Sequence, residues 1–442
     1  MFPSEMIHRG TDDRLQVWKT LPRRKPLLLR GARQVGKTFA VRKFGESYPL
    51  LLEANFEEER DIHQFFEGSL DPVPICEKLS NYFGVKIAPG ETLVFFDEIQ
   101  ACPRALSALR FLHEKMPDVH VIAAGSLLEF ALEEIPSQGV GRLSSLFMYP
   151  VTFEEFLLAI GENGCWEMLQ KASPENPLER AFHRRLIDAL KVYLTIGGMP
   201  EVVQTYCHSR DLRECQEVLS DLLVTFRDDF SKYKAKAPTL LLNEVLQSIC
   251  RQAGAKFKYS SVDRELALKP IKNAVELLVL AGLARKVYHS DARGIPLGAQ
   301  VNPKRFKAII MDVGLHQRIL GVDIPEMMTA RGLEVVNKGS VAEVFVGQEY
   351  VAAQSSREPA SLYYWHREAR SSNAEVDYVA VRGGQVVPVE VKSGGSGSMQ
   401  SMRLFLRERN LSKGVRTSLE NFGVLPELDI LPLYAIGNYL RC

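Results

Sequence analysis

The sequence predicts a multidomain α/β protein. Its 442 residues exceed the roughly 100–200 residues of a typical domain, so we expect several domains. The chain is 46% hydrophobic and 25% charged, which is ordinary for folded globular proteins and excludes wholesale disorder. Residues 1–150 alternate short apolar runs with amphipathic stretches, which favours a mostly parallel sheet covered by helices on both faces.

Five apolar runs in residues 1–150 have the length and composition of buried strands. They are Pro26–Arg30, Leu50–Asn55, Thr92–Phe96, Val119–Ala124 and Ser145–Tyr149. Between them, Thr38–Phe44 and Pro103–Met116 show the apolar spacing of helices. We therefore predict one parallel-sheet domain over residues 1–150.

The rest of the chain divides into three predicted segments. Residues 151–238 are helical, begin with a Thr152 and Glu155 capping box, and are expected to form a helical lid. Residues 239–330 contain three helical stretches followed by two strands. These elements are Thr239–Gln252, Ser260–Leu268, Pro270–Ala281, Leu283–His289 and Phe306–Met311. Residues 331–442 mix helices with strands and form a predicted α/β domain.

A glycine-rich loop follows the first predicted strand. It fits the pattern G-x-x-x-x-G-K-[ST] and consists of Gly31, Ala32, Arg33, Gln34, Val35, Gly36, Lys37 and Thr38. Between a strand and a helix, such a loop directs backbone N–H groups and the positive end of the helix dipole toward phosphates. Lys37 is expected to reach the β- and γ-phosphates, and the Thr38 hydroxyl to bind Mg²⁺. The loop predicts ATP with Mg²⁺.

Four other residues, which come later in the chain, are expected to extend this site. Asp97 ends a buried strand and is expected beside the Mg²⁺, while Glu98 is placed to polarise an attacking water. Ser126 follows the next strand and is a candidate sensor of the γ-phosphate. In Gly139–Arg142, Arg142 is either an arginine finger toward a neighbouring subunit or a surface residue in a structural ion pair.

With these motifs, residues 20–160 resemble the AAA-superfamily P-loop ATPases with Walker A and Walker B elements. More narrowly, the chain resembles prokaryotic ATPases that carry a C-terminal domain of unknown function. The stretches Tyr149–Phe156 and Gly197–Pro200 recur in that family. The resemblance implies the ATPase fold and little about biological role.

Residues 240–320 are basic in a chain whose formal net charge is +1. They hold 13 Lys and Arg against 6 Asp and Glu, a difference of +7. Three helices followed by two strands is the pattern of a winged helix-turn-helix, so DNA is an expected partner. Lys269 and Lys272 start its recognition helix, and four more lie on or beside the wing: Arg293, Lys304, Arg305 and Lys307. The alternative is a structural winged helix that packs on the ATPase domain.

A predicted hairpin turns at Gly383-Gly384. This turn places Arg382 opposite Gln385, Asp377 opposite Glu390, and Glu375 opposite Lys392. Two carboxylates directly opposite should repel by up to ~1 kcal/mol. A bound cation, or a raised pKa on one of them, would offset that cost.

Asp377 followed by Glu390 and Lys392 resembles the signature of the PD-(D/E)xK nucleases, with Glu343 matching the helical acid of that superfamily. The resemblance implies Mg²⁺ or Mn²⁺ on Glu343, Asp377 and Glu390, and Lys392 orienting or activating water. The chain departs from the pattern by having Val376 before Asp377 instead of proline. The alternative is a nuclease-like but inert fold whose acids are satisfied by Lys392 and arginines.

The sequence has no run of 18 apolar residues, no apolar segment near Met1 and no C-x-x-C pair among its seven cysteines. We expect a cytoplasmic protein without a membrane partner. The predicted function is ATP hydrolysis coupled to DNA-facing modules. If Arg142 is a finger, we expect identical subunits to form an oligomer with shared ATP sites. The alternative is a nucleotide-gated switch whose C-terminal fold binds a protein partner.

Overall fold

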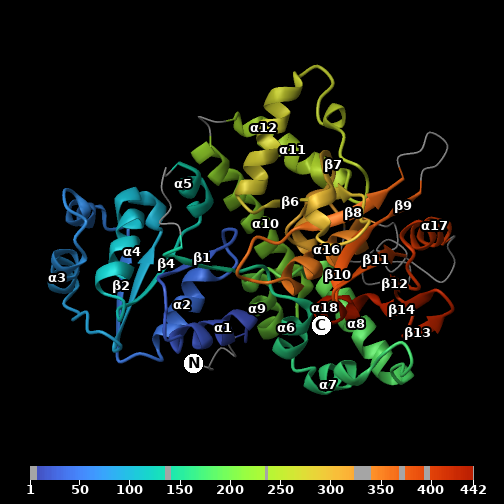
Figure 1. Cartoon of the computed structure of the whole chain (residues 1–442), viewed down its shortest axis with the longest axis horizontal. Coiled ribbons are helices and arrows are strands. Elements are labelled where there is room, and N and C mark those ends of the chain that lie inside the picture. Colours follow the sequence, from blue (N-terminus) through green and yellow to red (C-terminus); the bar gives the residue numbers. More distant parts are fainter. Residues whose placement is uncertain are drawn as a thin grey trace. The chain divides into compact units, whose positions relative to one another are not determined.

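The computed structural model describes residues 7–134, 141–233, 237–322, 340–367, 374–392 and 399–441. The chain divides into two compact units, whose elements are labelled in Figure 1. The first unit comprises His8–Tyr149 and Ser355–Pro359. The second comprises Pro150–Gln354 and Ala360–Cys442, together with Ile7. The predicted segments 151–238, 239–330 and 331–442 thus lie in one unit, apart from the short piece Ser355–Pro359.

The first unit contains a five-stranded sheet in the order β2-β3-β4-β1-β5, with every neighbouring pair parallel. Its strands are β1 (Leu27–Arg30), β2 (Leu50–Asn55), β3 (Thr92–Asp97), β4 (His120–Ala124) and β5 (Ser144–Phe147). All residues of β3 and β4 are buried, as expected for central strands covered on both faces. The predicted parallel sheet is confirmed.

The helices of the first unit connect these strands. They are α1 (Gly10–Lys19), α2 (Lys37–Gly45), α3 (Pro72–Phe83), α4 (Pro103–Lys115) and α5 (Leu128–Glu134), with 3₁₀ turns at Arg60–Phe66 and Ile99–Ala101. Leu79 of α3 and Leu109 of α4 join one apolar core with Val94 and Phe96 of β3. This core fixes the sheet whose strand ends carry the candidate nucleotide site.

The second unit begins with helices. They are α6 (Phe153–Ala159), α7 (Asn163–Lys171), α8 (Arg180–Ile196), α9 (Pro200–Ser209) and α10 (Leu212–Asp229), followed by a 3₁₀ turn at Phe230–Tyr233. The predicted capping box is confirmed: Thr152 Oγ1 accepts from Glu155 N at 3.2 Å, and Glu155 Oε2 accepts from Thr152 N at 2.9 Å.

The turn Gly197–Pro200 is explained by Asp312, far along the chain. Gly197 has a φ of 74°, and a Cβ there would lie 2.2 Å from Asp312 Oδ1. Gly198 N donates to Asp312 Oδ2 at 2.6 Å, while Oδ1 accepts from Leu315 N at 2.9 Å. Asp312 therefore caps helix α13 (Val313–Leu320) and holds the turn between α8 and α9.

The segment predicted as a winged helix contains α11 (Thr239–Arg251), α12 (Leu268–Leu280), β6 (Ala284–Ser290) and β7 (Val301–Ile310). The predicted middle helix is wrong: between α11 and α12 the structure has a 3₁₀ turn at Tyr259–Ser261. The side chain of Asp263 accepts from Glu265 N at 2.7 Å and from Leu266 N at 3.2 Å. These local hydrogen bonds compete with helix formation.

Two sheets complete the second unit. One has the order β10-β11-β12-β14-β13, and the other β7-β6-β8-β9. The remaining elements are α16 (Ser340–Ala353), β8 (Leu362–His366), β9 (Glu375–Val376), β10 (Tyr378–Arg382), β11 (Gln385–Val391), α17 (Gln400–Arg409), β12 (Gly414–Ser418), β13 (Gly423–Leu425), β14 (Leu428–Pro432) and α18 (Ile436–Arg441). Because β6 pairs with β8 in parallel, the second of these sheets crosses the predicted boundary between residues 330 and 331.

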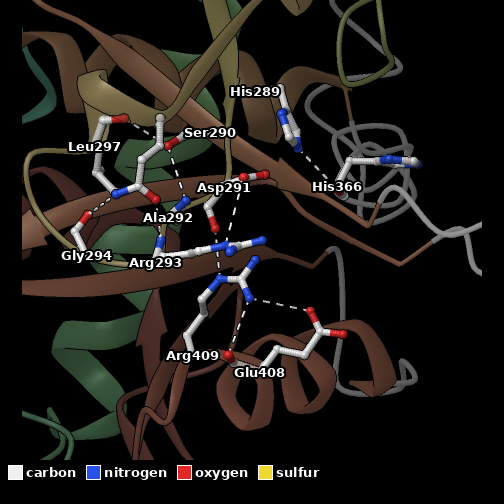
Figure 2. Close-up of polar contacts among 11 residues, drawn as sticks. His289, Ser290, Asp291, Ala292, Arg293, Gly294, Leu297, His366, Glu408 and Arg409 are labelled. Atoms are coloured by element: carbon white, nitrogen blue, oxygen red, sulfur yellow. Dashed lines mark hydrogen bonds and ion pairs between the residues drawn. The ribbon is translucent and has the colours of Figure 1, made fainter.

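Hydrogen bonds hold the start of the loop between β6 and β7, as Figure 2 shows. Ser290 Oγ donates to the Leu297 carbonyl oxygen at 2.9 Å inside the loop. Arg409 of α17 donates Nε to the Asp291 carbonyl oxygen at 2.8 Å. The side chain of Arg293 nevertheless remains 75% exposed. Elsewhere, none of the helices that the structure describes is long and apolar enough to cross a membrane.

Candidate functional site

The predicted phosphate loop lies between β1 and α2. Its backbone needs glycine at two points: Gly31 has a φ of 143°, and Gly36, which precedes α2, has a φ of 92°. A Cβ on Gly31 would lie 2.2 Å from the Met148 carbonyl oxygen, so no other residue fits there. Gln34 also has a positive φ, 63°. The predicted loop residues Gly31 to Thr38 therefore form one tight turn that ends in the first residues of α2.

Lys37 points back over this loop. Its Nζ donates to the carbonyl oxygens of Gly31 at 2.9 Å and of Ala32 at 2.7 Å. Burial lowers the pKa of Lys37 to about 8, although Glu98 and Asp97 act in the opposite direction. A buried ammonium that donates to neutral carbonyl oxygens would gain from an anion placed beside it. A phosphate in the loop would supply that charge.

Thr38 and Asp97 meet across the site. Thr38 Oγ1 donates to Asp97 Oδ2 at 2.9 Å, which brings the first turn of α2 to the end of β3. Burial raises the pKa of Asp97 to about 6, against the hydrogen bond from Thr38. Two adjacent hard oxygen ligands, one of them a desolvated carboxylate, fit Mg²⁺ and its preference for oxygen.

Glu98 is held beside them in an unusual backbone conformation. Its φ is 47°, in the left-handed region that side chains other than glycine seldom adopt. Its Oε2 accepts from Ser126 N and Ser126 Oγ, each at 3.0 Å, and from Gln100 Nε2 at 2.6 Å. Burial acts to raise the pKa of Glu98, but these hydrogen bonds outweigh it and the pKa is lowered. The carboxylate is thus kept ionised and oriented.

Two features of this arrangement were not predicted from the sequence. Ser126, a predicted phosphate sensor, here uses both of its donors on Glu98. Gln100, two residues after Glu98, belongs to the site although no sequence motif predicted it. Its amide donates to the same carboxylate. A polar residue beside a predicted base on a tight turn is the only sequence signal that could have indicated it.

Two arginines outside the loop motif have partners within the first unit. Arg142 Nε makes an ion pair with Glu114 Oε1 of α4, which is the structural alternative named above. Gly139 and Val140 of the same motif lie outside the described residues. The buried Arg9, also missed, donates Nη2 to the Tyr149 carbonyl oxygen at 2.7 Å and Nη1 to that of Val35 at 3.5 Å. Arg9, the residue before α1, therefore contacts both the loop and the backbone at Tyr149.

The carboxylate hairpin forms with the predicted register for most of its length. Gly383 and Gly384 have φ values of 56° and 75°, and pairing runs from Arg382 with Gln385 to Tyr378 with Val389. The ladder ends with Tyr378, before Asp377, so the predicted pairing of Asp377 with Glu390 does not form. Strand β9 turns away and pairs with β8, so that Glu375 lies opposite His366. The predicted pairing of Glu375 with Lys392 is therefore wrong, because the strand bends at Asp377.

The charged side chains at this bend have other partners. Lys392 Nζ lies 2.7 Å from Glu390 Oε1, and Asp377 Oδ2 accepts from Val391 N at 2.9 Å. Glu390 Oε2 is buried without a hydrogen-bond partner. Burial, reinforced by Asp377, raises the pKa of Glu390 to about 7. Burial and Asp377 also raise the pKa of Glu343 to about 8.

Lys307 of β7 enters this carboxylate cluster. Its Nζ lies 2.6 Å from Glu375 Oε1, 3.1 Å from Glu343 Oε2 and 3.3 Å from Asp377 Oδ1. The side chain is 2% exposed. The sequence placed Lys307 beside the wing as a DNA contact, and its burial corrects that prediction. The sequence signal that could have indicated burial is the position of this lysine within the apolar run Phe306–Met311.

Other basic residues of the segment stay at the surface. Lys269 and Lys272 are exposed in the first turns of α12. Lys286, by contrast, makes an ion pair with Glu276 of α12. The excess of positive charge available to a partner is therefore smaller than the sequence count.

Comparisons with known proteins bear on these sites. Residues 23–157 match the family model of an AAA domain. Residues 187–326 match a domain of unknown function (DUF8612), and residues 338–436 match another (DUF4143). None of the curated proteins matches this chain. The match, together with the glycine-rich loop and the parallel sheet, shows a P-loop ATPase-like AAA domain over residues 23–157, most of which lie in the first unit.

The solved structures that align with this chain include the Walker-type ATPase of Pyrococcus abyssi. It is 14% identical, and the alignment covers 72% of this chain and 97% of that chain with a TM-score of 0.47. The ORC1 protein of Aeropyrum pernix, solved in complex with DNA, is 15% identical. That alignment covers 72% of this chain and 94% of the other, with a TM-score of 0.29.

Proposed function

We propose that this chain hydrolyses ATP with Mg²⁺ at the loop between β1 and α2. The observation that carries the proposal is the 2.9 Å hydrogen bond between Thr38 Oγ1 and Asp97 Oδ2, directly beside the ionised Glu98. Backbone N–H groups of the loop and the start of α2 would bind the phosphates. Lys37 would move from the carbonyl oxygens of Gly31 and Ala32 to the terminal phosphates.

Thr38 and Asp97 would hold the Mg²⁺, which when bound neutralises charge on the phosphates. Glu98 would orient the attacking water and accept its proton. Ser126 and Gln100 would keep the Glu98 carboxylate in one orientation, because three hydrogen bonds converge on the same oxygen. Arg142 is proposed as a finger toward a second subunit, a role that requires it to leave Glu114.

DNA is the proposed partner of the second unit, and the exposed Lys269 and Lys272 of α12 support it. Hydrolysis in the first unit would then change how DNA is held. The measurement that tests both proposals is the rate of phosphate release from ATP, with and without single-stranded, duplex and branched DNA. Stimulation by DNA is expected. A protein that turns over ATP without response to any DNA contradicts the coupling and leaves the ATPase proposal standing.

A second function is favoured by the ion pairs of Lys307. It is a nucleotide-gated switch whose C-terminal fold is a scaffold for a protein partner, in the cytoplasm. Such a protein would hold nucleotide with little turnover. Slow phosphate release together with tight ATP binding would support the switch over DNA-coupled ATP hydrolysis.

A further inference from the structure

We propose that Lys307 is the resident cation of the C-terminal carboxylate cluster and takes the place that a divalent metal ion would occupy. The inference concerns the second unit alone and does not depend on ATP hydrolysis in the first. The cluster consists of Glu343 on α16, Glu375 on β9, and Asp377 at the bend between β9 and β10. Lys307 reaches it from β7, a strand of the predicted wing.

The geometry is that of an ammonium group with all its donors used. A lysine ammonium has three N–H donors, and three carboxylates from three parts of the fold lie within 2.6–3.3 Å of Lys307 Nζ. The Tyr364 ring, with its centroid 5.5 Å from Nζ, adds a favourable cation–π contact. A lysine buried to this degree is tolerated only when it is paired.

Several oxygens of the carboxylates expected to bind a metal ion are correspondingly engaged by groups of the protein. Asp377 has both oxygens engaged, Oδ1 with Lys307 and Oδ2 with Val391 N. Glu390 Oε1 is paired with Lys392, which leaves Oε2 as its one oxygen without a hydrogen-bond partner. Across the described residues, no three His, Cys, Asp or Glu side chains are grouped so that they could hold a metal ion. The donor set expected for Mg²⁺ or Mn²⁺ therefore does not fit one in this arrangement.

The ion pairs also join parts of the chain that are far apart in sequence. Lys307 ties the wing strand β7 to α16 and to the bend in the carboxylate hairpin. The charge that would make Lys307 a phosphate contact is thereby used inside the protein. The ion pairs of the cluster then hold these elements of the second unit together.

The test measures metal binding directly by Mn²⁺ electron paramagnetic resonance, and stability by thermal unfolding. Both are carried out without nucleotide on the full chain carrying Lys37→Ala, so that the ATP site is silenced. We expect no Mn²⁺ bound with micromolar affinity and the same Tm in EDTA and in excess Mg²⁺ or Mn²⁺. In this background Lys307→Met should lower the Tm by several degrees, gain one bound Mn²⁺ per chain, and recover stability when the metal is added.

Two further variants complete the design. Lys286 lies on β6, the strand next to β7, and pairs with the half-exposed Glu276 of α12. Lys286→Met is the control and should bind no metal. If Lys307→Met does not fold, Lys307→Met with Glu375→Gln removes one unpaired carboxylate and keeps Glu343, Asp377 and Glu390. Metal uptake by the Lys37→Ala protein that disappears in Asp377→Ala and Glu390→Ala would overturn the proposal. So would the absence of metal uptake in a folded Lys307 variant.

Discussion

The backbone N–H and the hydroxyl of Ser126 both donate to Oε2 of Glu98, each at 3.0 Å. This contact joins the end of β4 to the end of β3, two neighbouring strands of the parallel sheet. It gives the proposed water-orienting carboxylate a fixed direction and lowers its pKa together with the hydrogen bond from Gln100, against the effect of burial. The catalytic role proposed for Glu98 therefore depends on a residue 28 positions away.

Lys37 and Glu98 should have separable effects. Lys37→Ala is expected to abolish tight ATP binding, because it removes the charge that faces the phosphates. Glu98→Gln should keep the binding and lower hydrolysis by roughly 10²–10⁴-fold, the usual contribution of a general base. Calorimetric titration and phosphate release measure the two effects. Glu58→Gln, an exposed residue near the same sheet edge, is the control. Hydrolysis at the parent rate by Glu98→Gln would show that another group activates the water.

Ser126→Ala should act through Glu98. It removes one hydrogen bond to the ionised carboxylate, so the pKa of Glu98 should rise and the acidic limb of the kcat profile should move to higher pH. ATP affinity should change little. A large loss of affinity with an unchanged pH profile would instead indicate that Ser126 contacts the γ-phosphate directly.

Arg142 can be tested by mixing two inactive proteins. If Arg142 completes the site of a second subunit, Arg142→Ala mixed with Lys37→Ala should regain part of the hydrolysis, because one mixed interface has both residues intact. Glu114→Ala separates the structural ion pair from catalysis, since it frees Arg142 without removing it. If Arg142→Ala and Glu114→Ala lower the rate of ATP hydrolysis equally, and mixed oligomers do not recover it, the role of Arg142 is only its structural ion pair with Glu114.

DNA binding should weaken steeply with salt if α12 contacts phosphates. Reversing Lys269 and Lys272 to Glu should lower the affinity and reduce the slope of log K against log salt by roughly 2, about 0.9 for each phosphate contact. Arg14→Glu with Arg23→Glu, at exposed positions of the first unit, is the matched control. If the two pairs of substitutions have equal effects in fluorescence-polarisation titrations, the segment of residues 239–330 has a structural role only.

Glu349 should make the stability of the second unit depend on pH. It is buried, its Oε1 accepts from Phe153 N at 2.9 Å, and burial raises its pKa to about 7. Because the folded-state pKa exceeds the ordinary value of about 4.5, its contribution to stability is present at low pH and is lost as pH rises through 7. Glu349→Gln keeps the acceptor and does not titrate. Between about pH 5 and pH 8, the free energy of unfolding of the variant should rise by about 2–3 kcal/mol relative to that of the parent.

Urea unfolding at the two pH values measures this difference, and the exposed Glu201→Gln should show none. A constant difference between Glu349→Gln and the parent across the range would mean that Glu349 is already protonated, or already ionised, throughout it.

Local signals in the sequence predicted several features that the structure confirms. The capping box of Thr152 and Glu155, the hairpin turn at Gly383-Gly384, and the strand–loop–helix around Lys37 each depend on residues within a few positions of one another. The backbone conformation of such segments is dictated by nearby side chains and by glycine, so one sequence contains the necessary information.

Tertiary structure alone decided which charges meet. Lys307 and Glu343 are 36 residues apart, and Glu98 and Ser126 are 28 apart; no local pattern links either pair. The bend at Asp377 sends Glu375 to Lys307 instead of Lys392, because β9 pairs with β8 and leaves the hairpin. A buried charge takes whatever partner the packing of distant strands and helices brings within hydrogen-bonding distance, since leaving it unpaired would cost more than any local preference.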